Sequence, residues 1–148
     1  MPTVYTIGYL RKPLSVFIDQ LREAGIDVVI DVRLHNTSQL AGYAKKDTLE
    51  FLLEEGFDIA YEHHPELAPT DEIFRAYKSE EGGDWTAYEA AFLPLLSTRE
   101  AEGIGAEILA RYNAPCLLCS EPTADRCHRR LVAEYWAKHD PDLGVVHL

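Results

Sequence analysis

The sequence predicts an α/β protein: a single layered domain over residues 1–148, with a mostly parallel sheet of about five strands flanked by helices. Segments rich in β-branched residues alternate along the chain with segments whose apolar residues recur at helical spacing. The segment 27–32 is apolar almost throughout, as in a strand buried on both faces of a parallel sheet. The length of 148 residues suits one domain.

Each expected element has a local justification. The strands are short β-rich or apolar runs bounded by turn residues, at 3–7, 27–32, 57–61, 115–120 and 144–148. The helices show apolar residues three or four apart, at 13–24, 47–55, 70–78, 85–97, 101–112 and 126–139. Pro13 fits a first helical turn, Gly25 and Gly56 suit helix ends, and Asp47 and Thr70 are placed to cap helices.

Charge and cysteine content narrow the function classes. The chain has 14 Lys and Arg against 25 Asp and Glu, a formal net charge of −11, which argues against binding along a nucleic-acid track or an anionic membrane. No apolar run approaches the roughly 18 residues of a membrane span, and the first residues do not resemble a signal peptide. Three cysteines do not make a secreted disulfide framework. We therefore expect a cytoplasmic protein.

The parallel sheet predicts where a ligand binds, because ligands of open α/β sheets lie outside the carboxyl ends of the strands. The candidate substrate-binding residues are those that follow the expected strand ends: Gly8, Tyr9, Arg33, Ser38, His63, Glu66, Cys119 and Arg129. Eight of the 14 basic residues fall in or beside the same loops: Arg11, Lys12, Arg33, Lys45, Lys46, Arg126, Arg129 and Arg130. We expect a local anion pocket on an acidic body, assisted by the N-terminus of the last helix.

Asp31 and Arg33 form a first candidate pair. Asp31 lies inside an apolar run, and a buried carboxylate must be paired or hydrogen-bonded. Residues two apart on a strand point to the same face. The pair is either a carboxylate and a guanidinium that face one ligand or a structural ion pair at the strand end.

The segment 119–129, with sequence CSEPTADRCHR, carries the second candidate group. Asp125 or Thr123 is expected to cap the last helix, which places Cys127 in its first turn, where the helix dipole favours a thiolate. Three interpretations stay open. Cys127 is a nucleophile or redox thiol with Cys119 as partner, or Cys119, Cys127 and His128, with or without His63 or His64, hold a metal such as Zn²⁺, or both cysteines are inert and buried.

These segments together resemble the bacterial and archaeal family known as domain of unknown function 488. The resemblance runs through TIGY at 6–9, IDVR at 30–33, YEHHPEL at 61–67, LLCSE at 117–121 and CHR at 127–129. It implies a small α/β domain and supplies no activity.

The leading hypothesis is an enzyme that acts on a small anionic substrate, nucleotide-like or phosphorylated. Arg33 and Arg129 would bind the anion, with Gly8 permitting close backbone approach. The candidate catalytic residues are Asp31 or Glu121 as acid or base, and Cys127, supported by His128, as nucleophile or polarising group. One alternative is a metal-binding or thiol-redox protein built on Cys119, Cys127 and His128. Another is a non-catalytic module that binds a nucleotide or a nucleic-acid end. No particular cofactor is indicated.

Overall fold

The computed structural model describes residues 2–37, 42–79 and 83–148. The strands within these ranges are β1 (Thr3–Gly8), β2 (Val28–Asp31), β3 (Ala60–His63), β4 (Pro115–Cys119) and β5 (Gly144–His147). The α-helices are α1 (Leu14–Glu23), α2 (Lys46–Phe51), α3 (Asp71–Ser79), α4 (Trp85–Thr98), α5 (Ala101–Arg111) and α6 (His128–His139). Shorter helical turns are Gly42–Ala44, Pro65–Leu67 and a π-helical turn over Leu52–Gly56 that continues α2.

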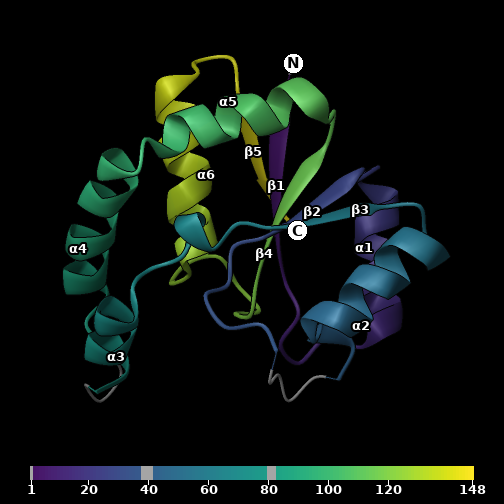
Figure 1. Cartoon of the computed structure of the whole chain (residues 1–148), viewed down its shortest axis with the longest axis horizontal. Helices are drawn as coiled ribbons and strands as arrows, with labels where there is room; N and C mark the ends of the chain where they lie inside the picture. The colour runs from purple at the N-terminus through teal and green to yellow at the C-terminus, as the bar shows by residue number, and fades with distance from the viewer. Residues whose placement is uncertain (1, 38–41, 80–82) are drawn as a thin grey trace.

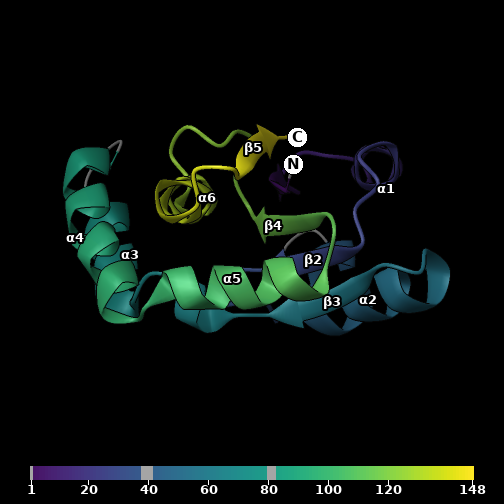
Figure 2. The same cartoon turned by 90° about the horizontal axis from the view of Figure 1, so that it is seen from above.

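The strands form one parallel sheet in the order β3-β2-β4-β1-β5, which confirms the predicted α/β class (Figure 1). Two buried apolar clusters lie on its two faces. One contains residues of α1 and α2, and the other contains residues of α4, α5 and α6. Figure 2 shows α1 and α6 on separate sides of the central strands. The alternation of side chains in β4 assigns Leu117 and Cys119 to the α6 side and Cys116 and Leu118 to the α1 side.

The strand order creates a switch point beside β4. The connections that leave β1 and β2 run through α1 and α2, which pack on one face, whereas β4 is followed by α6 on the other face. Since β4 pairs with both β1 and β2, its carboxyl end lies where neighbouring connections diverge. Ligand-binding crevices of open α/β sheets form at such points. Cys119, the last residue of β4, occupies this position.

The third strand begins and ends later than expected. Sequence patterning predicted a strand at 57–61, but β3 is Ala60–His63, so Glu62 and His63 belong to the strand itself. Phe57 ends the π-helical turn, Asp58 has a positive φ of 56°, and Ile59 is buried through a turn in which its amide donates to Leu53. The apolar residues Phe57 and Ile59 lie in this tight turn, and their spacing led to the wrong prediction of a strand at 57–61.

Helix starts differ in part from the expected caps. Thr70 Oγ1 accepts a hydrogen bond from the amide of Ile73, as predicted, and Asp84 caps α4 in the same way. The predicted Asp47 cap is wrong, because Lys45 occupies that position without a side-chain bond. The cap of α6 is Cys127, not Asp125 or Thr123, and the helix begins at His128. Among the described residues, no helix is both long enough and apolar enough to cross a bilayer.

Candidate functional site

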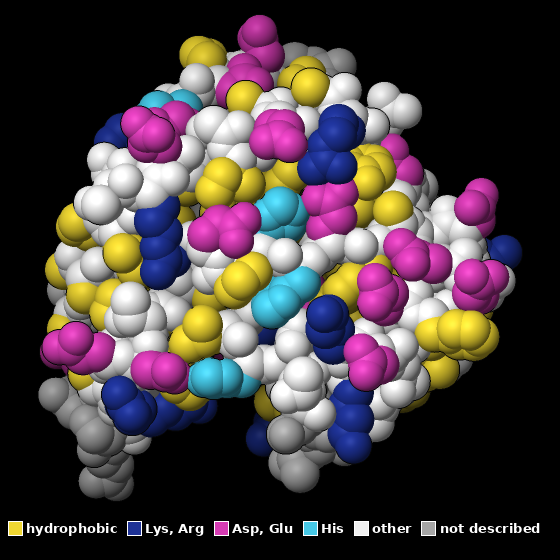
Figure 3. Space-filling view, in the orientation of Figure 1, with side chains coloured by type: hydrophobic (Ala, Val, Ile, Leu, Met, Phe, Trp, Pro, Cys, Tyr) yellow, Lys and Arg dark blue, Asp and Glu magenta, His cyan; other side chains and the backbone are white. Residues whose placement is uncertain are grey.

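A pocket of about 200 Å³ opens at the carboxyl ends of the strands. We call it the Arg33 pocket; its lining is Tyr9, Arg33, Leu34, His35, Pro69, Phe74, Cys119, Ser120 and His128. Four of the expected site residues, at positions 9, 33, 119 and 128, therefore meet in one place although they are far apart in sequence. In Figure 3 the lower edge of the molecule is notched, and basic side chains flank the notch on both sides.

Arg33 is held at the pocket wall by a buried ion pair with Asp31. Its Nε and Nη2 donate to the two carboxylate oxygens, each at 2.8 Å, and its main-chain amide donates to Oδ1 at 3.0 Å. Asn36 Nδ2, at 3.0 Å, and the Tyr61 hydroxyl also donate to Oδ2. Asp31 is 0% exposed and Arg33 is 4% exposed. Asp31 thus accepts five hydrogen bonds and has no contact with solvent. It holds Arg33 in place, and this geometry does not support the predicted role of Asp31 as a general base.

Electrostatics keep this pair charged. Burial alone raises the pKa of Asp31, but hydrogen bonds from Arg33, Tyr61 and Asn36 outweigh it and hold the pKa below its usual value. Burial likewise lowers the pKa of Arg33, and Asp31 more than compensates, so that the net pKa of the guanidinium is raised. The Tyr61 hydroxyl stays neutral and donates, because burial and the neighbouring carboxylate raise its pKa.

The third nitrogen of the Arg33 guanidinium, Nη1, takes no part in the pairing with Asp31. Nη1 is buried and has no hydrogen-bond partner among the described residues, although buried donors are nearly always paired. The guanidinium lies 5.1 Å from the centre of the Tyr9 ring, which orients it across the pocket. His63 Nε2 donates to the Arg33 carbonyl at 2.8 Å. His63 therefore positions the Arg33 main chain and does not line the pocket.

Cys119 and His128, which line the pocket, lie together with Cys127, which does not line it. Their ligating atoms all lie within 4.8 Å of one another, and the three residues are buried. Cys119 Sγ lies 3.6 Å from Nδ1 of His128. The other ring nitrogen of His128, Nε2, donates to the Val32 carbonyl at 2.6 Å, and Phe92 packs edge-on against the ring. These two contacts fix the His128 ring beside Cys119, whose Sγ lies at similar distances from Nδ1 and from Nε2, the latter at 3.9 Å.

The electrostatics of this pair favour the thiolate at Cys119 over Cys127. A hydrogen bond from the Cys127 thiol lowers the pKa of Cys119 and outweighs the effect of burial. Burial raises the pKa of Cys127, and its hydrogen bond to Cys119 raises it further. Cys127 lies at the N-cap of α6 and not in its first turn, and both thiols are buried, so the hydrogen bond between them is what separates the directions of their pKa shifts.

A second, smaller pocket of about 70 Å³ adjoins the first and shares Phe74, Cys119, Ser120 and His128 with it. We call it the aromatic pocket; its remaining lining is Tyr77, Lys78, Trp85, Tyr88, Glu121, Arg126 and Cys127. The Trp85 and Tyr88 rings are stacked with centres 4.9 Å apart. Lys78 Nζ lies 5.4 Å from the centre of the Phe74 ring, which is 42% exposed. Lys78 and these rings were not predicted as site residues, because they lie on α3 and α4 and do not directly follow a strand.

At Gly8 the main chain passes very close to the main chain of Glu121. A Cβ atom there would lie 1.7 Å from the Glu121 carbonyl oxygen. The same carbonyl accepts a hydrogen bond from Arg129 Nη1 at 2.7 Å. Arg129 is completely buried, lines neither pocket, and has no acidic partner among the described residues. The close backbone approach expected at Gly8 is therefore made by residue 121.

The remaining basic residues do not converge on the pockets. Of the eight expected at this edge, Arg33 and Arg126 line one pocket or the other. Arg130 pairs with Glu134 and donates to the Asp125 carbonyl.

Ser38, which was predicted to bind the substrate, lies outside the described residues.

Glu66 belongs to a separate cluster at the edge of the sheet. Its carboxylate lies 2.6 Å from Nδ1 of His64, and Nε2 of His64 lies 2.8 Å from Glu62. Glu62 also accepts hydrogen bonds from Arg111 and Tyr112. Arg111 contributes most to lowering the pKa of Glu62, to about 2.

This cluster predicts a measurable acid dependence of stability. A carboxyl group whose folded pKa lies below its unfolded value stabilises the fold above the unfolded pKa of 4.5, and the effect is lost as the pH falls toward 2. Glu62→Gln is expected to cost roughly 1–2 kcal/mol at pH 7 and progressively less between pH 4.5 and 2. Urea unfolding across this range measures it. Glu107→Gln is the control, since that 75% exposed residue lies 4.0 Å from Arg111; an equal effect in both variants would contradict the assignment.

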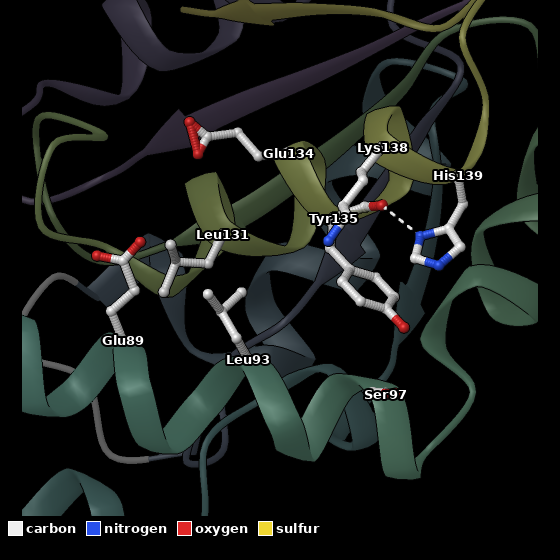
Figure 4. Close-up of a pocket in the computed structure, with 8 residues that line it drawn as sticks. All are labelled: Glu89, Leu93, Ser97, Leu131, Glu134, Tyr135, Lys138 and His139. Carbon is white, nitrogen blue, oxygen red and sulfur yellow. Dashed lines mark hydrogen bonds between the residues drawn. The ribbon is translucent and has the colours of Figure 1, made fainter.

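A surface hollow of about 390 Å³, larger than either of these pockets, lies elsewhere, between α4 and α6 (Figure 4). Leu93 and Leu131 face each other across it, and the one hydrogen bond drawn joins Nδ1 of His139 to the Tyr135 carbonyl. It contains two glutamates and no thiol, buried histidine or anchored cation. We therefore place the candidate site at the smaller pockets, where the chemically active groups converge.

Comparison with known proteins defines the family and leaves the chemistry to be inferred from this geometry. No curated protein and no solved structure matches the chain. The family model described as domain of unknown function DUF488 matches residues 13–136. This match covers most of the chain, including the segments that supply Arg33, Cys119 and His128, and the protein therefore belongs to the DUF488 family.

Proposed function

We propose that the protein is an enzyme that acts on a small anionic, nucleotide-like or phosphorylated substrate bound across the two adjoining pockets. The observation that carries this proposal is the guanidinium of Arg33, which is oriented by a buried carboxylate and keeps Nη1 without an acceptor. An arginine anchored on one edge presents its other edge to phosphate or carboxylate oxygens. A ligand anion would supply the missing acceptor.

The charges and rings around Arg33 support the same substrate class. The two pockets are lined by Arg33, Lys78 and Arg126 against the single carboxylate of Glu121, in a chain whose net charge is −11. The exposed Phe74 ring borders both pockets. Aromatic side chains next to cations suit a ligand with a planar base and a charged group.

We assign the chemistry to the thiol, imidazole and carboxylate groups that border the pockets. Cys119 and His128 border both pockets, and Glu121 borders the aromatic pocket. A thiolate beside an imidazole provides a nucleophile or a polarising group, and Glu121 provides a carboxylate that can exchange a proton with the ligand. Asp31 keeps Arg33 in place. Binding without conversion would instead favour a non-catalytic nucleotide-binding module.

Ligand binding is tested by thermal shift at constant ionic strength, with inorganic phosphate, nucleoside monophosphates and neutral nucleosides as probes. The double variant Lys78→Ala/Arg126→Ala is expected to bind the monophosphate at least about tenfold more weakly, because a hydrogen bond to a charged group is worth about 1.5–3 kcal/mol. Arg75→Ala/Lys138→Ala removes the same charge from exposed positions of α3 and α6 outside both pockets and is expected to keep full affinity.

Two results would contradict the proposal. One is equal stabilisation by nucleosides and their monophosphates, which would mean that the anion is not recognised. The other is equal loss of affinity in both double variants, which would mean that total charge and not the site controls binding. For a probe that binds, phosphorus NMR follows its conversion, and Cys119→Ser is expected to bind the probe without converting it.

A further inference from the structure

We propose that Cys119, Cys127 and His128 form a binding site for one thiophilic divalent cation of the Zn²⁺ class, with an open coordination position that faces the substrate pockets. The three residues come from the end of β4 and the start of α6, and their ligating atoms all lie within 4.8 Å of one another. Two cysteines and one histidine are a donor set that zinc adopts in proteins. Metal binding does not depend on the proposed function, whereas the role of the open position does.

The distance between donors fits the ion. A tetrahedral zinc with sulfur at about 2.3 Å and nitrogen at about 2.0–2.1 Å holds these two ligand atoms about 3.5 Å apart. Cys119 Sγ and His128 Nδ1 are 3.6 Å apart. The donors are therefore near the required spacing, and a turn of the imidazole would align Nδ1 with a shared ion, because Nε2 lies 3.9 Å from the same sulfur.

The surroundings of His128 match those of a metal ligand. Nε2 donates to the Val32 carbonyl at 2.6 Å, which leaves the lone pair of Nδ1 available to a metal. Histidine ligands commonly donate their second nitrogen to a main-chain carbonyl in this way, which fixes the ring and its tautomer. The edge-on contact with Phe92 restrains the ring plane further.

The number and position of the ligands argue for an open site. Among the residues that the structure describes, the cluster has three donors, while structural zinc sites are closed by four. Cys119 and His128 border both pockets, and Cys127 borders the aromatic pocket. The fourth position is therefore placed to take a water or an oxygen of an anionic ligand, with Glu121 in the lining of the same pocket.

The test uses the reduced full chain under anaerobic conditions, titrated with Co²⁺ alone. One equivalent is expected to produce the intense visible bands of tetrahedral Co²⁺ and a thiolate-to-metal charge-transfer band, both removed by Zn²⁺. Zn²⁺ at one hundred times its Kd is expected to raise Tm by about 5–10 °C. A protein that is folded by circular dichroism and stays spectroscopically silent would overturn the proposal.

Variants locate the site. Cys119→Ser and Cys127→Ser are each expected to lose most of the charge-transfer intensity, and His128→Gln to bind at least tenfold more weakly. Cys116→Ser is the matched control, because Cys116 is equally buried on β4 but packs on the opposite face of the sheet. Loss of the bands in the control to the same extent would overturn the proposal.

The metal site and the anion site can fail separately. Phosphate binding is measured in protein stripped of metal by a chelator, and Co²⁺ binding is measured without phosphate. An intact Co²⁺ spectrum with no anion binding would refute the proposed function alone. Anion binding by a protein that takes no Co²⁺ would refute the metal site alone.

Discussion

Replacing Gly8 with alanine is expected to lower the free energy of unfolding by about 3 kcal/mol or more. The new Cβ would lie 1.7 Å from the Glu121 carbonyl oxygen and 3.2 Å from Nη1 of Arg129. The closer contact is with main chain, so a rotation of a side chain cannot relieve it. The loop after β4 would have to move, and urea unfolding followed by circular dichroism measures the cost.

The buried charge of Arg129 makes this cost larger than ordinary overpacking. Its Nη1 donates to the Glu121 carbonyl, while Nε and Nη2 are buried without hydrogen-bond partners among the described residues. Displacing the carbonyl removes the one acceptor that the guanidinium has there. An unsatisfied buried polar group costs about 1–3 kcal/mol in addition.

Gly103→Ala is the control for Gly8→Ala. A Cβ at Gly103, in the first turn of α5, meets nothing within 4 Å. Alanine is favoured over glycine in helices by up to about 1 kcal/mol, so this variant is expected to be as stable as the wild type or more stable. A Gly8→Ala protein within about 1 kcal/mol of the wild type would show that the loop adjusts easily and that the close contact does not constrain the site.

The order and type of the elements were predictable because they depend on local patterning. The apolar run around β2 predicts that strand, and the helical spacing of apolar residues predicts α1 and α6, in each case without reference to the rest of the chain. The boundaries of β3 were not predictable, because Ile59 is buried by a turn as fully as a strand residue is by a sheet. The residue pattern is the same in both cases, and only long-range pairing with β2 separates them.

The site was predictable where its geometry is local. Arg33 follows Asp31 by two residues, so their pairing follows from strand periodicity. The Tyr61 and Asn36 donors were missed, because they reach Asp31 from another strand and from a loop. The convergence of Cys119 and His128 follows from the general rule for carboxyl ends of parallel strands. Which thiol is more acidic depends on the hydrogen bond between Cys119 and Cys127, and a sequence does not reveal its direction.

Breaking the buried pair is the second large effect that we predict. Arg33→Met is expected to lower the free energy of unfolding by about 3–5 kcal/mol, because Asp31 is then left charged and unpaired where it is 0% exposed. Asp31→Asn is expected to be costly for the complementary reason, since the guanidinium loses its carboxylate. Urea unfolding of both single variants at pH 7 measures these losses.

The double variant Asp31→Asn/Arg33→Met separates folding from recognition. It contains no buried charge at either position, so it is expected to be about 2 kcal/mol more stable than the sum of the single effects predicts. Anion binding is not expected to return with stability, because the nitrogen that we assign to the ligand is absent. Additivity of the two single variants would show that the ion pair is not coupled. Full affinity for a nucleoside monophosphate in the double variant would remove Arg33 from the binding site and leave Lys78 and Arg126 as the basis for recognition.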